Sequence, residues 1–314
     1  MRFTRKMAVI LTMPAFAVAL AAQQAQQPPP TAPAQGRGGG RGAQTPEQRE
    51  AREKAEQEKY AAVARVIPAR DSVWLEELSY IDARDAIKGG KTTALVLTGS
   101  TEQNGPWMDG GKHWYALKLV GEATARKLGN ALVAPIIPFE VGNSENKHQI
   151  WGTIYLTAET FQGIVRDVAN SLKGQGFKNV ILLGDSGGNT AGLAAVAREL
   201  SGKWAGEANI YHVGEFYNWT SKGGVRDFVT SNGIPEKSAS ADGIHDEYGL
   251  SAVLMAYDPK TIRFDERVKA GKATINGVPL EPKEKTIEMG KKIVEFRATV
   301  GAEAIKKAIA GGSK

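Results

Sequence analysis

Short apolar runs and longer amphipathic stretches alternate along the body of the chain. The apolar runs are typical of buried strands and cover residues 94–97, 131–137 and 179–183. The amphipathic stretches carry apolar residues at helical spacing and cover residues 115–128, 161–174 and 190–200. Strands separated by helices of this length are typical of a parallel sheet with helices on both faces. The pattern therefore predicts an α/β fold.

Three loops follow the three predicted strands, at residues 99–113, 138–153 and 184–189. In open α/β sheets, ligands usually bind at the carboxyl ends of the strands. The polar residues of these loops are therefore the first candidates for a functional site.

The N-terminus has the order of a secretory signal peptide. Basic residues precede an apolar run from Met7 to Leu20, and small residues around Ala21 form an Ala-x-Ala cleavage pattern. The run is interrupted by Pro14 and is shorter than the roughly 20 residues of a membrane-spanning helix. We predict a cleaved signal peptide at 1–21, and therefore a periplasmic or secreted protein that has no membrane attachment after cleavage.

Three further regions follow the signal peptide. Residues 22–44 are rich in Pro, Gly and Gln, a composition that predicts a disordered linker because it buries little apolar surface. Thr45 and Pro46 have the order of a helix start, and we predict a charged N-terminal helix over 45–68. Residues 69–314 form the predicted catalytic domain.

The net charge of +6 lies almost entirely in the N-terminal tail. Residues 1–44 hold five basic residues and no acidic one, which leaves 35 basic against 34 acidic groups in the rest of the chain. A nearly neutral body argues against nucleic acid as a partner, because phosphate binding needs clustered Lys and Arg. The chain has no Cys, which excludes disulfides and thiol chemistry.

The third loop contains Gly-Asp-Ser186-Gly-Gly between a strand and a helix. Gly-x-Ser-x-Gly is the nucleophile elbow of α/β-hydrolases, and Asp242 and His245 follow in the order of a catalytic triad. A serine hydrolase that uses Ser186 and His245 is therefore one alternative. The same residues also suit a glycine-rich turn in which Asp185 or Ser186 caps the next helix.

Histidine is scarce, and His113 shares the first loop with Glu102. Asp185 would lie at the end of a neighbouring strand. A set of carboxylate and imidazole groups suits zinc or manganese, provided that the fold brings the groups together.

These loops resemble those of the creatininase-like amidohydrolases. The resemblance runs from about Trp74 to the C-terminus, in the family's order of segments. These segments are Trp74-Leu-Glu-Glu-Leu, Leu97-Thr-Gly-Ser-Thr-Glu-Gln-Asn-Gly-Pro106, Gly152-Thr-Ile154, Ser171-Leu-Lys-Gly-Gln-Gly-Phe177, Gly187-Gly-Asn189 and Ile275-Asn-Gly-Val278. The resemblance implies a three-layer α/β sandwich with a mainly parallel sheet. It also implies a small-molecule substrate, hydrolysis of a cyclic or non-peptide amide C–N bond with one or two divalent metals, and a homo-oligomer such as a hexamer.

The chain departs from the family pattern at the metal motifs. The family's Glu-x-His-Gly is Glu102-Gln-Asn104-Gly here, and the bridging Asp expected eleven residues after that Glu is His113. In the third loop Ser186 stands where the family has His, and Asp185 is gained beside it. Without a bridging carboxylate, one ion is expected rather than two.

We therefore predict one Zn²⁺ or Mn²⁺ ion, held by Glu102, His113 and Asp185, that activates a water. The catalytic residues expected around the ion supply a base, a proton carrier and groups that orient the carbonyl or the water. They are His245, Glu247, Asn104 and Ser186.

Aromatic and polar residues near the loops are candidates for substrate binding. They are Trp107, Trp114, His148, Trp151 and Asn189. The aromatic rings could stack on a flat heterocyclic or guanidino-like substrate, although packing in the core or between subunits is the alternative. A third interpretation is a non-catalytic periplasmic binding or scaffold protein, which the loss of two usual ligands favours. Residues 206–243 show no strong pattern, so the substrate cannot be named from the sequence.

Overall fold

The computed structural model describes residues 44–234 and 245–312. The chain divides into two compact units, Met1–Tyr60 and Ala61–Lys314. The predicted signal peptide and nearly all of the predicted linker lie outside the described residues. Among the residues described, no helix combines the length and the apolar character needed to cross a bilayer.

Helix α1 (Pro46–Ala61) is charged along its length and has no buried residue. Its N-terminus is capped as the sequence predicts, because the Gln48 amide donates to Thr45 Oγ1 over 3.3 Å. The helix ends at Ala61 rather than at 68. The residues that follow include several β-branched side chains and then Pro68, which favour extended backbone.

A four-stranded parallel sheet forms the centre of the second unit. Its order is β2-β1-β5-β6, and its register pairs Thr93 with both Ala131 and Asn179. The strands are β1 (Thr93–Thr98), β2 (Ala131–Val133), β5 (Asn179–Gly184) and β6 (Asn209–His212). Every residue of β1 is buried, as expected of an apolar strand in a parallel sheet.

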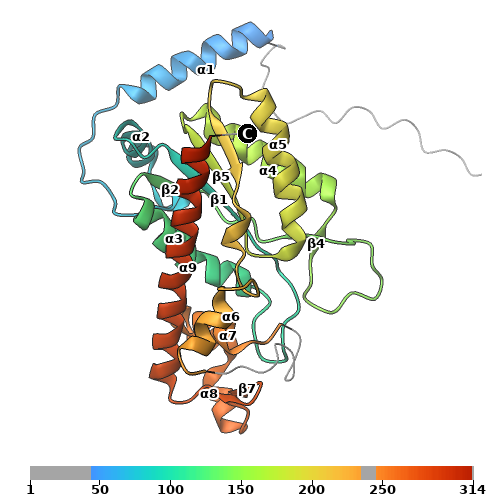
Figure 1. The fold of residues 1–314 in the computed structure, drawn as a ribbon. Helices are drawn as coiled ribbons and strands as arrows, with labels where there is room; N and C mark the ends of the chain where they lie inside the picture. The colour runs from blue at the N-terminus through green and yellow to red at the C-terminus, as the bar shows by residue number, and fades with distance from the viewer. Residues whose placement is uncertain (1–43, 235–244, 313–314) are drawn as a thin grey trace, which may run out of the picture. The chain divides into compact units, whose positions relative to one another are not determined.

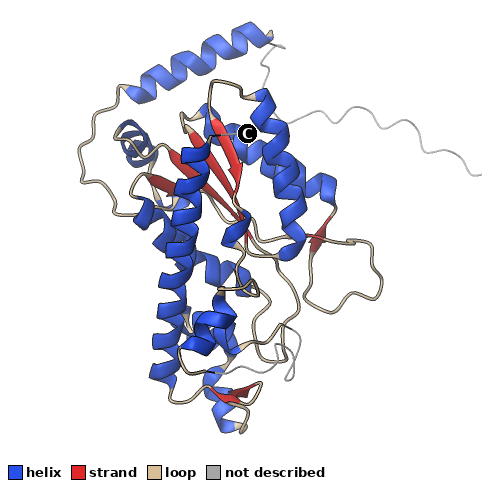
Figure 2. Cartoon of the chain, viewed as in Figure 1, coloured by secondary structure: helices blue, strands red, loops and turns tan. Residues whose placement is uncertain are grey.

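Alternate residues of β1 face opposite sides of the sheet. Ala94 and Val96 pack against α4 (Ala158–Gly174) and α5 (Thr190–Lys203). Leu95 and Leu97 pack with α3 (Lys112–Leu128) and the C-terminal part of α9 (Lys283–Gly311). Figure 2 shows the strands enclosed by helices. The predicted three-layer α/β sandwich with a parallel sheet is thus confirmed.

A second hydrophobic cluster lies where the chain leaves the carboxyl ends of the strands. It is built from α6 (Val225–Ser231), α7 (Tyr248–Tyr257), the 3₁₀ turn η4 (Pro259–Ile262) and α8 (Phe264–Lys269), with the hairpin β7 (Thr274–Ile275) and β8 (Val278–Pro279). Helix α9, red in Figure 1, runs along both this cluster and the sheet layer. It therefore ties the two clusters together.

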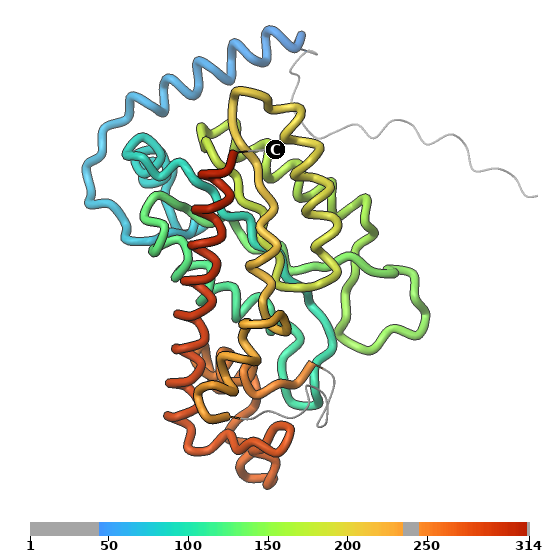
Figure 3. Tube along the Cα trace, in the orientation of Figure 1, coloured from blue at the N-terminus to red at the C-terminus, as the bar shows by residue number. Residues whose placement is uncertain are grey.

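Smaller elements complete the second unit. They are η1 (Leu75–Glu77), α2 (Tyr80–Lys88), β3 (Glu140–Val141), β4 (Tyr155–Leu156), η2 (Gly187–Asn189) and η3 (Gly214–Phe216). Strands β3 and β4 pair in parallel, and the chain between them projects outward as a long loop (Figure 3).

The second predicted strand, 131–137, is interrupted. Strand β2 ends at Val133, and the chain rejoins β1 only at a single bridge between Ile137 and Thr98. Pro135 has no N–H to donate to a neighbouring strand, which explains the break.

Candidate functional site

A cavity of about 370 Å³ opens where the loops after β1 and β5 meet. Its walls come from these loops, from β3 and β4, and from the residues around the start of α7. The lining residues are Glu102, Lys112, His113, Glu140, Tyr155, Ser186, Gly187, Gly188, Tyr217, Trp219, Thr220, His245, Glu247 and Leu250. This is the location that the sequence predicts for a ligand, at the carboxyl ends of parallel strands.

Glycine allows α3 to begin directly behind β1. A Cβ on Gly99 would lie 2.6 Å from the Cβ of His113, closer than two carbon atoms can approach. Without that Cβ, the first turn of α3 brings Lys112 and His113 against the end of the strand. Both side chains are buried.

Three nitrogen atoms approach one carboxylate oxygen, Oε1 of Glu102. Lys112 Nζ lies 2.8 Å away, His113 Nε2 3.1 Å and His245 Nδ1 3.5 Å. Burial by itself would raise the pKa of Glu102, but the His113 hydrogen bond and the Lys112 charge outweigh it and lower the pKa to about 2. Glu102 is therefore a carboxylate held by neighbouring nitrogens.

His113 bridges two carboxylates. Its Nε2 faces Glu102, and its Nδ1 lies 2.9 Å from Asp185 Oδ2. Burial opposes the charged imidazole, but hydrogen bonds with Asp185 and Glu102 outweigh burial and raise the pKa of His113. A protonated His113 donates from both ring nitrogens, one to each carboxylate.

Asp185 is fully buried behind His113, and its other oxygen meets two more donors. Trp219 Nε1 donates to Asp185 Oδ1 over 3.1 Å, and the buried guanidinium of Arg297 pairs with the same oxygen. Burial raises the pKa of Asp185, but the Arg297 charge and the His113 hydrogen bond reverse the shift and lower it to about 2. Asp185 therefore positions His113 rather than facing the cavity.

Glu140 is a cavity carboxyl group whose pKa is shifted upward, opposite to the shift of Glu102. Burial, with the charge of Glu102 added, raises the pKa of Glu140 to about 7. Gly188 leaves the room that this side chain uses, because a Cβ there would lie 3.3 Å from the Glu140 carboxyl carbon. A carboxyl group that titrates near neutrality in a cavity is suited to general acid–base chemistry.

The structure brings the three predicted metal ligands side by side without forming a clear metal site. Glu102, His113 and Asp185 are adjacent, but they do not surround one position, because His113 lies between the two carboxylates and both its ring nitrogens are engaged. Within residues 44–234 and 245–312, no group of three or more His, Cys, Asp or Glu side chains could hold a metal ion.

The predicted catalytic residues fall into two groups. Ser186, His245 and Glu247 line the cavity, and Glu247 is paired with Arg226 over 3.3 Å. Asn104 lies outside the lining and donates to the carbonyl oxygens of Glu102 and Asp109, so it braces the first loop. His245 has a left-handed backbone with φ of 56°, a conformation that costs energy for a residue with a Cβ.

None of the residues predicted to bind substrate lines the cavity. Trp114 packs edge-on against Tyr115 and Tyr257, and Trp107 lies over Arg267. His148 and Trp151 are exposed on the loop between β3 and β4.

Asn189, the fifth of these residues, is buried and joins three loops. Its amide nitrogen donates to Thr98, Gly99 and Phe139, and its oxygen accepts from the Val141 amide. Its contacts are therefore structural.

The serine-hydrolase alternative lacks the geometry of a nucleophile elbow. Ser186 has φ −123° and ψ 138°, which is ordinary extended backbone, whereas the elbow is a strained turn. No hydrogen bond links Ser186 to His245 among the residues that the structure describes. Asp242, the third member of that triad, lies outside them.

The sequence interpretation missed two charged residues of this cluster, Glu140 and Arg297. Lys112 stands beside His113 in the sequence and could receive a carboxylate, but the pattern gave it no necessary role. Arg297 had a usable signal, because it stands four residues after Ile293 and four before Gly301, on the buried side of a long helix. A cation at that spacing indicates a buried partner. Glu140 lies in the second loop, but nothing in the sequence places it beside Glu102.

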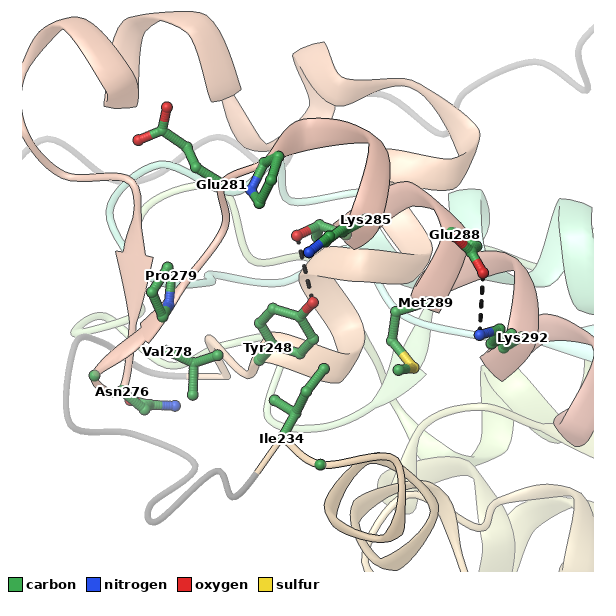
Figure 4. Close-up of a pocket in the computed structure, with 14 residues that line it drawn as sticks. Ile234, Tyr248, Asn276, Val278, Pro279, Glu281, Lys285, Glu288, Met289 and Lys292 are labelled. Carbon is green, nitrogen blue, oxygen red and sulfur yellow. Dashed lines mark hydrogen bonds and ion pairs between the residues drawn. The ribbon is translucent and has the colours of Figure 1, made fainter.

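A second cavity, of about 690 Å³, lies between α7, α9 and the β7–β8 hairpin (Figure 4). The hydroxyl groups of Tyr248 and Thr286 form a hydrogen bond there, and Lys292 forms an ion pair with Glu288. None of the predicted site residues lines this cavity.

Comparisons with known proteins identify a family and solved structures that share the fold of this chain. The family model Creatininase, described as creatinine amidohydrolase, matches residues 76–304. No curated protein matches the chain.

Solved creatininase structures share the fold of this chain. A mutant creatininase of the Zn-Zn type has a TM-score of 0.56 and 20% identity, over 76% of this chain and 98% of the other. A manganese form of creatininase gives the same values. A crystal structure of creatinine amidohydrolase gives a TM-score of 0.53 and 18% identity over 77% and 98%.

Proposed function

Because the chain belongs to the creatininase (creatinine amidohydrolase) family, we propose that it hydrolyses an amide C–N bond of a small molecule in the cavity beside Glu102. Family membership supports a metal-dependent amidohydrolase. The observation that carries the location is the cluster of Glu102, Lys112, His113 and Glu140 in one cavity at the carboxyl ends of β1 and β5.

Two structurally related creatininases are named as zinc and manganese forms, so a divalent ion has to be tested against the residues of this chain. The described residues do not fit one. They hold no group of three suitable side chains, and Lys112 Nζ occupies the space 2.8 Å from the Glu102 oxygen that an ion would need. The roles proposed below are therefore those of the chain's own residues.

Lys112 is placed to hold a substrate carbonyl. An ammonium group has three N–H donors, and only one of them is needed for Glu102. A second donor can meet the carbonyl oxygen and stabilise the negative charge that develops when water adds to the carbon. Tyr217 and Trp219 form part of the cavity wall, and a volume of about 370 Å³ suits a small molecule.

Glu140 is placed to move protons. In amide hydrolysis, the water oxygen bonds to the carbonyl carbon, the C–N bond breaks and the leaving nitrogen takes a proton. With a pKa raised to about 7 by burial, Glu140 exists near neutrality as both carboxylate and acid. The carboxylate can take the proton from water, and the acid can return it to the nitrogen.

The test is a screen of small cyclic and linear amides, with release of amine or new carboxylate as the readout. Glu140→Gln is expected to lower kcat by about 100-fold and to remove the limb of the pH profile near neutrality. Glu145→Gln, an exposed glutamate on the same loop, is the matched control and should leave the rate unchanged. Absence of hydrolysis for every amide, or an unchanged rate in Glu140→Gln, would refute the proposal.

Export and self-association are also part of the proposed function. The N-terminal pattern supports a periplasmic or secreted location. Trp151 is 94% exposed, with Ile150 and Ile154 half exposed beside it, which supports contact with a second copy of the chain. Light scattering of the wild type and of Trp151→Ser tests this, with a smaller mass expected for the variant.

A further inference from the structure

We propose that the ammonium group of Lys112 is the resident cation of this site and excludes a divalent ion from Glu102, His113 and His245. The inference uses the same cavity as the proposed function, but its test does not depend on hydrolysis. It rests on the position of Lys112, on what that position costs, and on the charge of the cluster around it.

The arrangement around Glu102 has the form of a cation site that is already filled. The Lys112 nitrogen lies 2.8 Å from Oε1, and two histidine nitrogens approach the same oxygen. An ion bound to this carboxylate and these imidazoles would lie about 2 Å from each ligand atom. It would then overlap with the Lys112 ammonium.

Lys112 occupies an unfavourable position for a lysine. Its side chain is 3% exposed, although lysine is almost never buried without a partner. It is also the first residue of α3, where the helix dipole disfavours positive charge. The Glu102 carboxylate, with the charges of Asp185 and Glu140, offsets part of these costs, although burial still holds the pKa of Lys112 below its ordinary value. The ion pair of Lys112 and Glu102 is therefore a built feature of the site.

The two buried carboxylates already face cations without a metal, and the protonated His113 between them adds a further positive charge. The carboxylates of Glu102 and Asp185 are matched by the cations of Lys112 and Arg297, each in direct ion-pair contact. A divalent ion would add two positive charges beside a buried ammonium. Repulsion at such distances is worth several kcal/mol even at an effective dielectric constant of about 20.

Removal of the ammonium should therefore open the site to metal. In Lys112→Met, the Glu102 carboxylate loses its cation, and His245 Nδ1 remains beside the same oxygen. An ion bound there would displace the proton from His113 Nε2, which could then serve as a further ligand. Lys112→Arg keeps the charge and should still exclude the ion. Lys118→Met is the matched control, because Lys118 lies on the same helix but pairs with Glu76 and Glu77 outside the cavity.

The experiment is titration of chelator-treated protein with Zn²⁺ and Mn²⁺ by calorimetry, with metal content measured after gel filtration. Wild type, Lys112→Arg and Lys118→Met should retain no stoichiometric ion, and Lys112→Met should bind at least about 100-fold more tightly than wild type. A wild type that keeps one ion per chain, and loses it in Glu102→Gln, would overturn the inference even if Lys112→Met does not fold. Equal affinities of folded wild type and Lys112→Met would also overturn it.

The two proposals fail in different ways. If metal binding behaves as expected but no amide is hydrolysed, the proposed function is wrong and the role of Lys112 stands. If amides are hydrolysed only when wild type carries a bound ion at Glu102, the hydrolase function stands and the role of Lys112 is wrong.

Discussion

Asp185 is the residue at which the sheet, the first turn of α3 and the C-terminal helix meet. It follows β5 directly, accepts from His113 and Trp219, and pairs with Arg297 of α9. The carboxylate is fully buried, so each of these contacts is made without competition from water.

Asp185→Asn is expected to lower the free energy of unfolding by about 3–5 kcal/mol, because it leaves the Arg297 charge buried without a counter-charge. Arg297→Met should lower the free energy of unfolding by a similar amount, because it leaves the buried Asp185 carboxylate without this cation. The double variant should be more stable than the sum of the two losses implies, by about 2 kcal/mol. Urea unfolding of the four proteins measures this coupling. Additive losses would show that the pair does not act as a unit.

The ionisation of Glu140 makes the stability of the fold depend on pH. Its pKa is raised from 4.5 to about 7 by burial, so the folded state binds a proton more tightly than the unfolded state does. Stability is therefore lost as pH rises from about 4.5 through 7. Glu140→Gln removes this loss. Its free energy of unfolding should exceed that of wild type by about 2 kcal/mol at pH 9 and by less at pH 5. Denaturant unfolding at both pH values tests the sign, and Glu145→Gln should show no such trend.

The sequence predicted the proximity of some site residues but not of others. Glu102 and His113 were predicted to lie together, and the structure brings them within 3.1 Å, because one loop and one helix start carry both. Arg297 reaches Asp185 from 112 residues further along the chain, a contact that depends on how α9 packs. Likewise, the position of Asp185 behind His113 depends on the sheet register, which local patterns do not specify.

At the scale of elements, apolar periodicity predicted β1, β5 and the helices α3, α4 and α5 close to their observed bounds. It did not resolve α7, which is buried nearly all round and so lacks an amphipathic pattern. It also gave no structure to 206–243, where β6, η3 and α6 occur among the described residues. These elements are short and obtain their stability from packing rather than from local preference.

Packing of α9 against α7 depends on a single glycine. A Cβ at Gly290 would lie 1.9 Å from the Ala252 carbonyl oxygen, a contact that only separation of the two helices can relieve. Gly290→Ala is expected to destabilise the chain by about 3 kcal/mol, seen as a lower Tm in calorimetry.

Gly163→Ala is the matched control, because this glycine lies inside α4 and the added methyl group would have no atom within 4 Å apart from the backbone of its own helix and its chain neighbours. It should raise stability by about 0.5–1 kcal/mol, since glycine weakens a helix interior. A loss of stability in Gly163→Ala as large as in Gly290→Ala would mean that helix–helix contact is not the cause.

At the scale of the whole molecule, the family match over 76–304 falls entirely within the unit Ala61–Lys314. The three hydrophobic clusters and the cavity also belong to this unit. The sequence predicts a tail ahead of this unit from composition, because residues 22–44 are rich in Pro, Gly and Gln and lack apolar residues at helical or strand spacing.

We expect the proposed export of the chain and its folding to be independent of each other. The apolar run Met7–Leu20 is expected to direct secretion, and α1 contributes no buried residue to any core. Leu11→Arg, which places a charge within the run, should keep the protein in the cytoplasm of a bacterial host at its full mass. Deletion of residues 1–60 should do the same.

Both proteins should unfold within about 2 °C of the exported form, because neither change touches a buried contact of the second unit. Cell fractionation with mass spectrometry reads out export, and calorimetry reads out folding. A large fall in Tm after the deletion would show that the N-terminal unit supports the fold, whereas continued export of Leu11→Arg would reject the signal peptide.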